Sequence, residues 1–170
     1  MRYTNGYKSL QQELHARGGY GTSGYKHAQH VLELAKRLET RNVLDFGCGQ
    51  QTLQKAIPFA ITNYDPFIPG CDEEPEPHDL VVCSDVLEHI EPECLEDVLA
   101  QLHSKTKRML FVDIAQRPAK KELADGRNAH LIQESTTWWL QKLLPYFEPK
   151  SLQTYEGGLV AAFTPSVRPA

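Results

Sequence analysis

The stretch VLDFGCGQQTL, residues 43–53, constrains the fold more than any other part of the sequence. An apolar run with β-branched and aromatic side chains carries Asp45 near its end. Two glycines follow at Gly47 and Gly49, and a helix-like segment comes next. A glycine turn between a strand and a helix lets the backbone approach a ligand at the carboxyl end of the strand. The stretch therefore predicts an α/β protein with a ligand at this turn.

The remaining segments extend the same alternation of strands and helices. Helices are expected at 7–16, 25–39, 50–57, from Pro92 onward and at 135–144, and strands at 42–46, 60–64, 79–83 and 108–114. The strands are continuous apolar runs, which favours a mostly parallel sheet covered on both faces. Two further strands flank Gly157 and Gly158 with no helix between them, which predicts a C-terminal antiparallel hairpin.

Composition and charge exclude several classes of protein. A chain of 170 residues with 41% hydrophobic residues suits one globular domain, residues 1–170. Its formal net charge of -4 provides no domain-wide basic surface for nucleic acid. There is neither an apolar run long enough to span a membrane nor an apolar signal-peptide segment, so no membrane partner is expected.

Cysteine usage indicates the compartment. The four cysteines are Cys48, Cys71, Cys83 and Cys94, and no two have CxxC spacing. We therefore expect free thiols and a cytoplasmic protein.

The residues around the glycine turn limit the ligand. The sequence has no GxxxxGK[ST] string, and GCGQQT places Thr52 where a dinucleotide fingerprint has its third glycine. The carboxylate of Asp45 would repel a pyrophosphate and attract a cation. Asp65 ends the next strand, where an acid can accept hydrogen bonds from both hydroxyls of a ribose. A ribose and a cationic group without phosphate describe S-adenosylmethionine, whose methionine end carries an ammonium.

Three motifs resemble those of the class I S-adenosylmethionine-dependent methyltransferases, and especially the members that act on small molecules. VLDFGCGQQTL is similar to their first motif, D-x-G-x-G, at residues 45–49. NYDPF is similar to their ribose-binding strand end, and DLVVCSDVLEHIEP, residues 79–92, to their fourth-strand motif. The resemblance covers about residues 28–115. It implies a Rossmann-like core over residues 26–170, with S-adenosylmethionine as cofactor and S-adenosylhomocysteine as product.

The resemblance also implies a set of cofactor-binding residues. Asp45 would hold the methionine ammonium, the glycine turn would lie under the cofactor, and Asp65 would bind the ribose. Ser84 and Asp85 would lie near the adenine or the methyl sulfur, although a helix cap would explain them equally well. Residues 1–25 would form an N-terminal lid, with Tyr20 its first candidate contact. The full cofactor set is Tyr20, Asp45, Gly47, Cys48, Gly49, Asp65, Pro66, Ser84 and Asp85.

One departure from the family pattern affects the sheet. The family has a helix and a third strand between the ribose acid and the fourth strand, whereas this chain has only the acidic loop FIPGCDEEPEPH, residues 67–78. The third-strand unit is therefore expected to be shortened or missing. Its loss leaves the residue that recognises adenine undefined, and it exposes an edge that could form a homodimer.

Methyl transfer needs a base only when the acceptor must lose a proton early. His89 and His130 are the catalytic candidates, since both are expected at the carboxyl edge of the sheet. Arg127 and Asn128 are candidates for binding the acceptor. A structural hydrogen bond for His89 and a surface loop for His130 remain alternatives. No metal site is expected, because the histidines are scattered; Glu88 with His89 is the pair that a metal could use.

Three functions remain open. The first is transfer of a methyl group to an O or N atom of a small-molecule acceptor. The second is a nucleotide, nucleic-acid or protein methyltransferase. DNA amino-methyltransferases have [DN]PP[YF] after the fourth strand, and this chain has CSDV there. The third is a protein that binds S-adenosylmethionine without catalysis.

Overall fold

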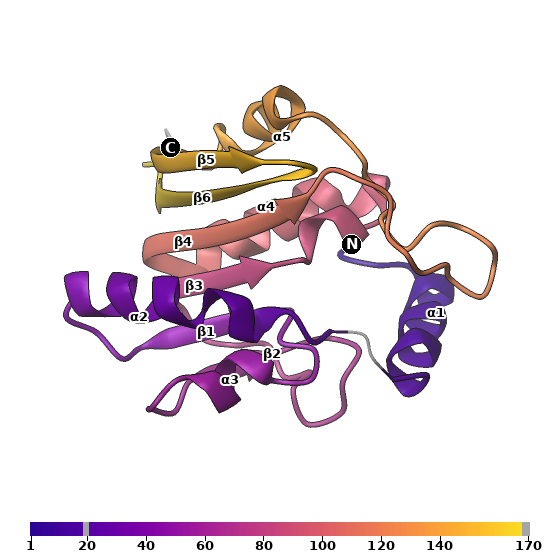
Figure 1. Cartoon of the computed structure of the whole chain (residues 1–170), viewed down its shortest axis with the longest axis horizontal. Coiled ribbons are helices and arrows are strands. Elements are labelled where there is room, and N and C mark those ends of the chain that lie inside the picture. Colours follow the sequence, from indigo (N-terminus) through magenta and orange to yellow (C-terminus); the bar gives the residue numbers. More distant parts are fainter. Residues whose placement is uncertain (19–20, 168–170) are drawn as a thin grey trace.

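A computed structural model describes residues 1–18 and 21–167 of the chain. Their centre is a six-stranded sheet with the order β2-β1-β3-β4-β6-β5 (Figure 1). The strands are β1 (Val43–Phe46), β2 (Thr62–Tyr64), β3 (His78–Ser84), β4 (Thr106–Ala115), β5 (Phe147–Tyr155) and β6 (Gly158–Pro165). The α-helices are α1 (Asn5–Ala16), α2 (Ala28–Arg37), α3 (Thr52–Ala56), α4 (Leu95–Lys105) and α5 (Thr136–Leu143). Three short 3₁₀ turns, η1 (Gly24–His27), η2 (Leu87–His89) and η3 (Pro92–Cys94), complete the elements.

The pairing of the strands confirms the predicted sheet. β1 runs parallel to β2 and β3, and β3 runs parallel to β4. β6 is antiparallel to both β4 and β5, which makes the C-terminal hairpin. β2 forms one edge of the sheet, and a loop leads from it directly to β3. The missing third strand is therefore confirmed within the described residues.

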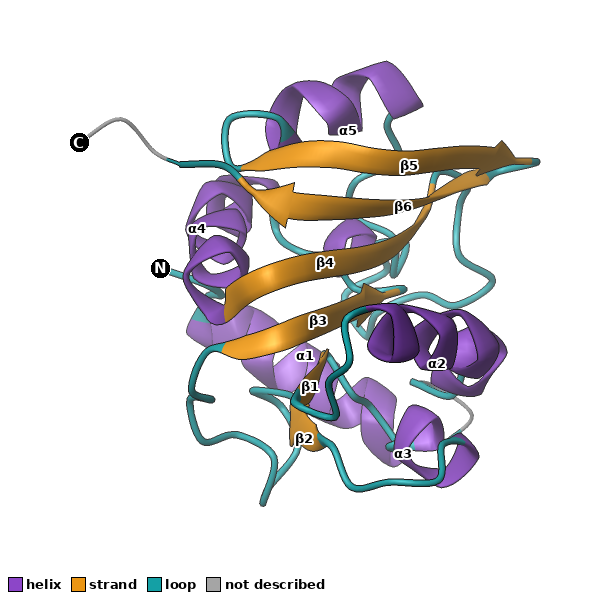
Figure 2. Ribbon diagram, turned by 90° about the vertical axis from the view of Figure 1, so that its left-hand side faces the viewer, coloured by secondary structure: helices purple, strands orange, loops and turns teal. Residues whose placement is uncertain are grey.

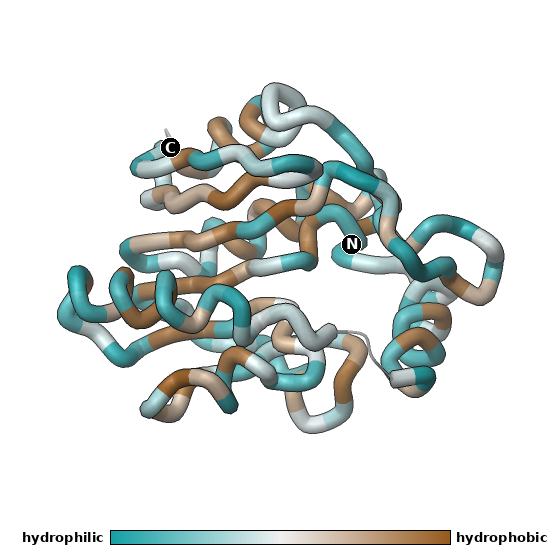
Figure 3. Tube along the Cα trace, viewed as in Figure 1, coloured by the Kyte–Doolittle hydropathy of each residue, from teal (hydrophilic) through white to brown (hydrophobic). Residues whose placement is uncertain are grey.

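Helices cover both faces of the sheet (Figure 2). On one face, α2 and α3 pack through Val31, Ala35 and Leu53 against apolar side chains of β1, β3 and β4. On the other face, α4 and α5 pack against the alternate side chains of the same strands, with Leu99 and Trp139 completely buried. The hydropathy of the trace follows this arrangement, since the central strands are hydrophobic and the connecting loops are mostly hydrophilic (Figure 3).

Helix α1 stands apart from these two layers. It lies beyond the carboxyl ends of the parallel strands, beside the long loop that follows β4 (Figure 1). Its buried side chains Tyr7 and Leu14 pack against Leu123 and Ala129 of that loop, in a small apolar cluster of their own. The side-chain oxygen of Thr4 caps the helix by accepting a hydrogen bond from the Tyr7 amide at 3.2 Å. Helix α1 and the loop thus form a cover over the edge of the sheet.

Two further findings concern the general expectations. All four cysteines are free, as predicted, and all four are also buried. Within the described ranges, none of the helices combines the length and the apolar character that crossing a bilayer requires.

Candidate active site

A cavity of about 400 Å³ opens at the carboxyl edge of the sheet. It lies where the order of the strands reverses, because β2 lies on one side of β1 and the next strand of the chain, β3, lies on the other. Ligands of open α/β sheets bind at such a switch point. The strand ends Phe46, Tyr64, Ser84 and Ala115 line its base, and α1 and the loop after β4 supply its outer wall.

The glycine turn after β1 is held tightly in place. The amides of Gly47 and Cys48 donate hydrogen bonds to the carbonyl oxygen of Tyr64 at 2.7 and 3.0 Å. Gly47 has a φ of 81°, and a Cβ atom there would lie 2.3 Å from Val86. Gly49 has a φ of 49°, and a Cβ atom there would lie 2.6 Å from the carbonyl oxygen of Gly21. Only glycine fits these two positions, and the turn presents bare backbone to the cavity.

Two acidic side chains line the cavity beside this turn. Asp45 and Asp65 each have only 5% of their surface exposed. Burial and, to a smaller extent, the nearby charge of Asp65 together raise the pKa of Asp45 to about 7. Burial also raises the pKa of Asp65, although its carboxylate accepts hydrogen bonds from the amides of Phe67 and Gly49 at 3.0 and 3.2 Å. A cationic ligand group would stabilise both carboxylates in their charged form.

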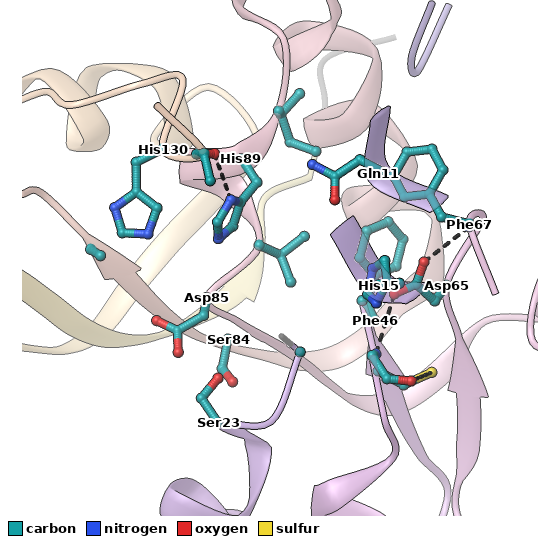
Figure 4. Close-up of a pocket in the computed structure, with 18 of the residues that line it drawn as sticks. Gln11, His15, Ser23, Phe46, Asp65, Phe67, Ser84, Asp85, His89 and His130 are labelled. Carbon is teal, nitrogen blue, oxygen red and sulfur yellow. Dashed lines mark hydrogen bonds between the residues drawn. The ribbon is translucent and has the colours of Figure 1, made fainter. Parts of the chain in front are cut away.

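The predicted cofactor residues that the structure describes all lie on this cavity. Gly47, Cys48 and Gly49 form the turn, and Pro66 follows Asp65. Ser84 is the last residue of β3 and Asp85 follows it directly, and both line the cavity together with Ser23 (Figure 4). Asp85 has a φ of 53°, and its amide donates to the carbonyl oxygen of Asp113 at 3.0 Å. Tyr20 lies outside the described residues.

Described residues of the N-terminal segment line the cavity, and their role as a lid stays a prediction. Tyr7, Gln11 and His15 of α1 line the outer wall, and residues 21–24 lie over the glycine turn. The Gln50 amide donates to the carbonyl oxygen of Gly21 at 2.9 Å. Sequence reasoning missed the three α1 side chains, because a single helix shows an apolar face but not what that face covers.

Phe67 is another cavity residue that sequence reasoning missed. It directly follows the Asp65–Pro66 pair and lines the cavity opposite His89 and His130, which form the histidine wall (Figure 4). Tyr3 and Tyr7 hold its ring in edge-to-face contacts, with ring centroids 5.0 and 5.9 Å apart. The sequence feature that could have predicted this residue is its position directly after Asp65 and Pro66, just beyond the end of β2.

The two predicted catalytic histidines meet on the opposite wall. The rings of His89 and His130 pack edge to face with centroids 4.7 Å apart (Figure 4). Nδ1 of His89 lies 2.7 Å from the carbonyl oxygen of Ala129, and Nδ1 of His130 lies 2.6 Å from that of Arg117. Burial and, to a smaller extent, the proximity of His130 together lower the pKa of His89 to about 3. His89 is therefore neutral at pH 7.

Arg127 and Asn128 do not line the cavity. The exposed Arg127 pairs with Asp125, with Nε 2.7 Å from the Asp125 carboxylate. The side chain of Asn128 accepts hydrogen bonds from the amides of Ala119 and His130, both at 2.9 Å, and donates to the Ala119 carbonyl oxygen at 3.0 Å. Asn128 therefore shapes the loop that places His130, and the acceptor role predicted for this pair finds no support in their positions.

Comparison with known proteins gives one sequence match and several similar folds. Residues 22–155 match a family described as a methyltransferase domain. No curated protein matches the chain in sequence.

Three solved structures illustrate the likeness in fold. A 1,6-didemethyltoxoflavin-N1-methyltransferase from Burkholderia thailandensis, with bound 1,6-didemethyltoxoflavin and S-adenosylhomocysteine, is 14% identical with a TM-score of 0.68, covering 98% of this chain and 92% of that one. N-methyltransferase NodS from Bradyrhizobium japonicum WM9, in complex with S-adenosylhomocysteine, is 18% identical with a TM-score of 0.61. The match covers 95% of this chain and 99% of that one. An rRNA methylase from Escherichia coli is 16% identical with a TM-score of 0.56. The match covers 96% of this chain and 77% of that one.

Proposed function

The chain belongs to the methyltransferase domain family, and from this premise we propose that it transfers the methyl group of S-adenosylmethionine to an O or N atom of a small-molecule acceptor. The observation that carries the proposal is the single cavity that Asp45, Asp65, the glycine turn and the two histidines share. Both carboxylates lie on the side where a ribose and an ammonium would bind. The histidines lie on the other side, where an acceptor would meet the methyl group.

The cofactor contacts that we propose follow from charge and shape. Asp45 binds the ammonium of the methionine end, directly or through water, and Asp65 binds the ribose hydroxyls. The backbone of residues 47–49 supports the cofactor, and residues 21–24 cover it. Phe67 offers an aromatic face next to Asp65, which suits the adenine in the absence of the third strand.

The size of the cavity supports a small acceptor. Ligand sites commonly measure about 300–1,000 Å³, and 400 Å³ is near the lower limit. The cofactor occupies much of this space. The remaining space lies under α1 and the loop after β4, which would block a nucleic-acid duplex.

The reaction requires alignment above all. The acceptor's lone pair attacks the methyl carbon, the carbon–sulfur bond breaks in line, and its electron pair stays on the sulfur. The cofactor supplies this activated methyl group. Residues of the cavity hold the two reactants on one axis and exclude water. Neutral His89 lies on the acceptor side beside His130, where an acceptor proton must leave.

Calorimetric titration with S-adenosylmethionine and S-adenosylhomocysteine tests the cofactor assignment. The expected result is micromolar binding by the wild type, loss of binding in Asp65→Ala and unchanged binding in Glu148→Ala. Glu148 is a matched control because its exposed carboxylate pairs only with Lys150 among the interactions described. Absence of binding to the folded wild type would refute the proposal. A screen of small hydroxyl and amine acceptors on the binding-competent protein then identifies the acceptor class.

A further inference from the structure

Glu88, His89 and His130 form a compact group of possible metal ligands on the acceptor side of the cavity. One side-chain donor atom from each residue lies within 4.8 Å of the other two. The residues come from η2 and from the loop after β4, and their neighbouring segments are bonded together. The Ile132 amide donates to the carbonyl oxygen of Glu88 at 3.0 Å, and His89 is bonded to Ala129. The group is therefore a fixed feature of the fold.

Both imidazoles are oriented as metal-binding imidazoles are. A carbonyl oxygen can only accept a hydrogen bond, so Nδ1 of His89 and Nδ1 of His130 must each carry the proton. In the neutral rings, Nε2 then carries the lone pair. A backbone carbonyl that fixes the tautomer through the second ring nitrogen is the usual support of a histidine ligand.

The carboxylate of Glu88 provides an independent indication. Glu88 is completely buried, and its Oε1 accepts a hydrogen bond from the Ala115 amide at 2.9 Å. Its Oε2 is buried without a hydrogen-bond partner among the described residues. Leaving such an atom unpartnered destabilises the fold, and more strongly if the atom is charged. One carboxylate oxygen of Glu88 belongs to the same cluster as the two imidazoles, and a cation bound to this carboxylate would provide the missing partner.

We propose that Glu88, His89 and His130 bind one divalent first-row transition-metal ion, such as Zn²⁺ or Co²⁺. Two imidazoles and one carboxylate suit these ions better than Mg²⁺ or Ca²⁺, which prefer oxygen ligands. Bonds of about 2.0–2.2 Å place neighbouring ligands of a tetrahedral ion about 3.5 Å apart, so binding draws atoms that lie within 4.8 Å of one another together by up to about 1.3 Å.

The ion would act on the acceptor, and this part of the proposal rests on the proposed methyl transfer. Three protein ligands leave at least one coordination position open, as in catalytic metal sites. His89 and His130 line the cavity, so this position faces the space assigned to the acceptor. A hydroxyl oxygen bound there loses its proton to water more readily, and its lone pair then attacks the methyl carbon. The acceptor is therefore a hydroxyl compound that can bind a metal through that oxygen.

A titration of tag-free, chelator-treated protein with Co²⁺, followed by visible absorption, tests the site. The expected result is one bound ion per chain with the spectrum of nitrogen and oxygen ligands, displaced by one equivalent of Zn²⁺. His130→Ala should weaken binding by about 10- to 100-fold or more. Because Glu88 is buried, Glu88→Gln is assayed only after circular dichroism shows that it folds, and His130 on its loop is the primary variant.

His30→Ala is the matched control. His30 is an exposed histidine of α2 outside the cluster, and its ring stacks on Phe111 with centroids 6.1 Å apart. This variant should bind Co²⁺ like the wild type. Absence of ion binding, or equal affinity in the wild type and His130→Ala, would overturn the metal site. Calorimetry with S-adenosylhomocysteine on the same samples keeps the two proposals separate, because His130→Ala should retain cofactor binding.

Discussion

The hydroxyl of Tyr155 donates a hydrogen bond to Oδ1 of Asp113 at 2.8 Å. β6 lies between β4 and β5 in the sheet, so this bond joins the end of β5 to β4 across β6. His27 of η1 approaches the other oxygen of the same carboxylate, with Nε2 2.8 Å from Oδ2. Asp113 pairs in register with Ser84 on β3, so this contact fixes strand ends at the base of the cavity.

Gly158 permits this contact, and Gly158→Ala should disrupt it. An added Cβ would lie 2.2 Å from the Tyr155 hydroxyl and 2.3 Å from ring atom Cζ, so the ring must move away from Asp113. We expect a loss of about 1–3 kcal/mol in the free energy of unfolding, measured by urea denaturation. In Gly6→Ala the Cβ would meet nothing within 4 Å, so that variant should be neutral or slightly stabilised. Equal stability of the two variants would contradict the argument.

The affinity for S-adenosylhomocysteine should depend on pH through Asp45. Because its pKa is about 7, the carboxyl is largely protonated at pH 6 and largely charged at pH 8. The raised pKa of Asp65 acts in the same direction, and burial lowers the pKa of the neighbouring His15, which adds no positive charge near neutrality. Calorimetry should show an affinity that falls by up to about tenfold per pH unit below pH 7. In Asp45→Asn the affinity should be low at both pH values.

Asp45→Asn should also change the stability of the ligand-free protein. The pKa of Asp45 is about 7 in the folded chain and close to 3.8 in the unfolded chain, so the folded state binds the proton more tightly. The stabilisation of the folded state by this bound proton is complete below pH 4 and is lost as the pH rises through 7. An uncharged amide avoids this loss. At pH 8 the free energy of unfolding of Asp45→Asn should exceed that of the wild type by on the order of 2–4 kcal/mol, and at pH 4 the gain should vanish. A gain that is the same at both pH values would refute this explanation.

The parts of the site that sequence could predict are local. Asp45, Gly47 and Gly49 lie within one strand and its turn. The two glycines indicate backbone with positive φ angles, and the aspartate indicates a negative charge at the turn. Asp65 ends the neighbouring strand, and parallel pairing alone brings it to the same edge. Motif and topology together therefore predicted that these residues line one side of the cavity.

The side of the cavity that carries His89 and His130 depends on contacts between distant segments, which no local pattern encodes. His130 meets His89 because the loop after β4 folds back, with the Ala129 carbonyl oxygen bonded to the His89 ring. The same fold turns Arg127 outward. Helix α1 was predicted from its own sequence, but its position over the cavity depends on packing against Leu123 and Ala129.

Tyr7 connects this cover to the histidine wall, and Tyr7→Phe tests the connection. The Tyr7 hydroxyl donates to the carbonyl oxygen of His89 and accepts from Nε2 of Gln11. Tyr7 is only 2% exposed, so removing its hydroxyl leaves two buried polar groups without this partner. The free energy of unfolding should fall by about 1–3 kcal/mol.

A matched variant separates this effect from the general loss of a tyrosine hydroxyl. Tyr25 is 57% exposed, so Tyr25→Phe should have the stability of the wild type within about 0.5 kcal/mol. Because Tyr7 bonds to the backbone of His89, Tyr7→Phe should also loosen the histidine wall. Amide hydrogen exchange should therefore be faster in η2 and α1 of Tyr7→Phe than in the same segments of Tyr25→Phe. Equal protection in both variants would show that α1 covers the cavity without holding His89 in place.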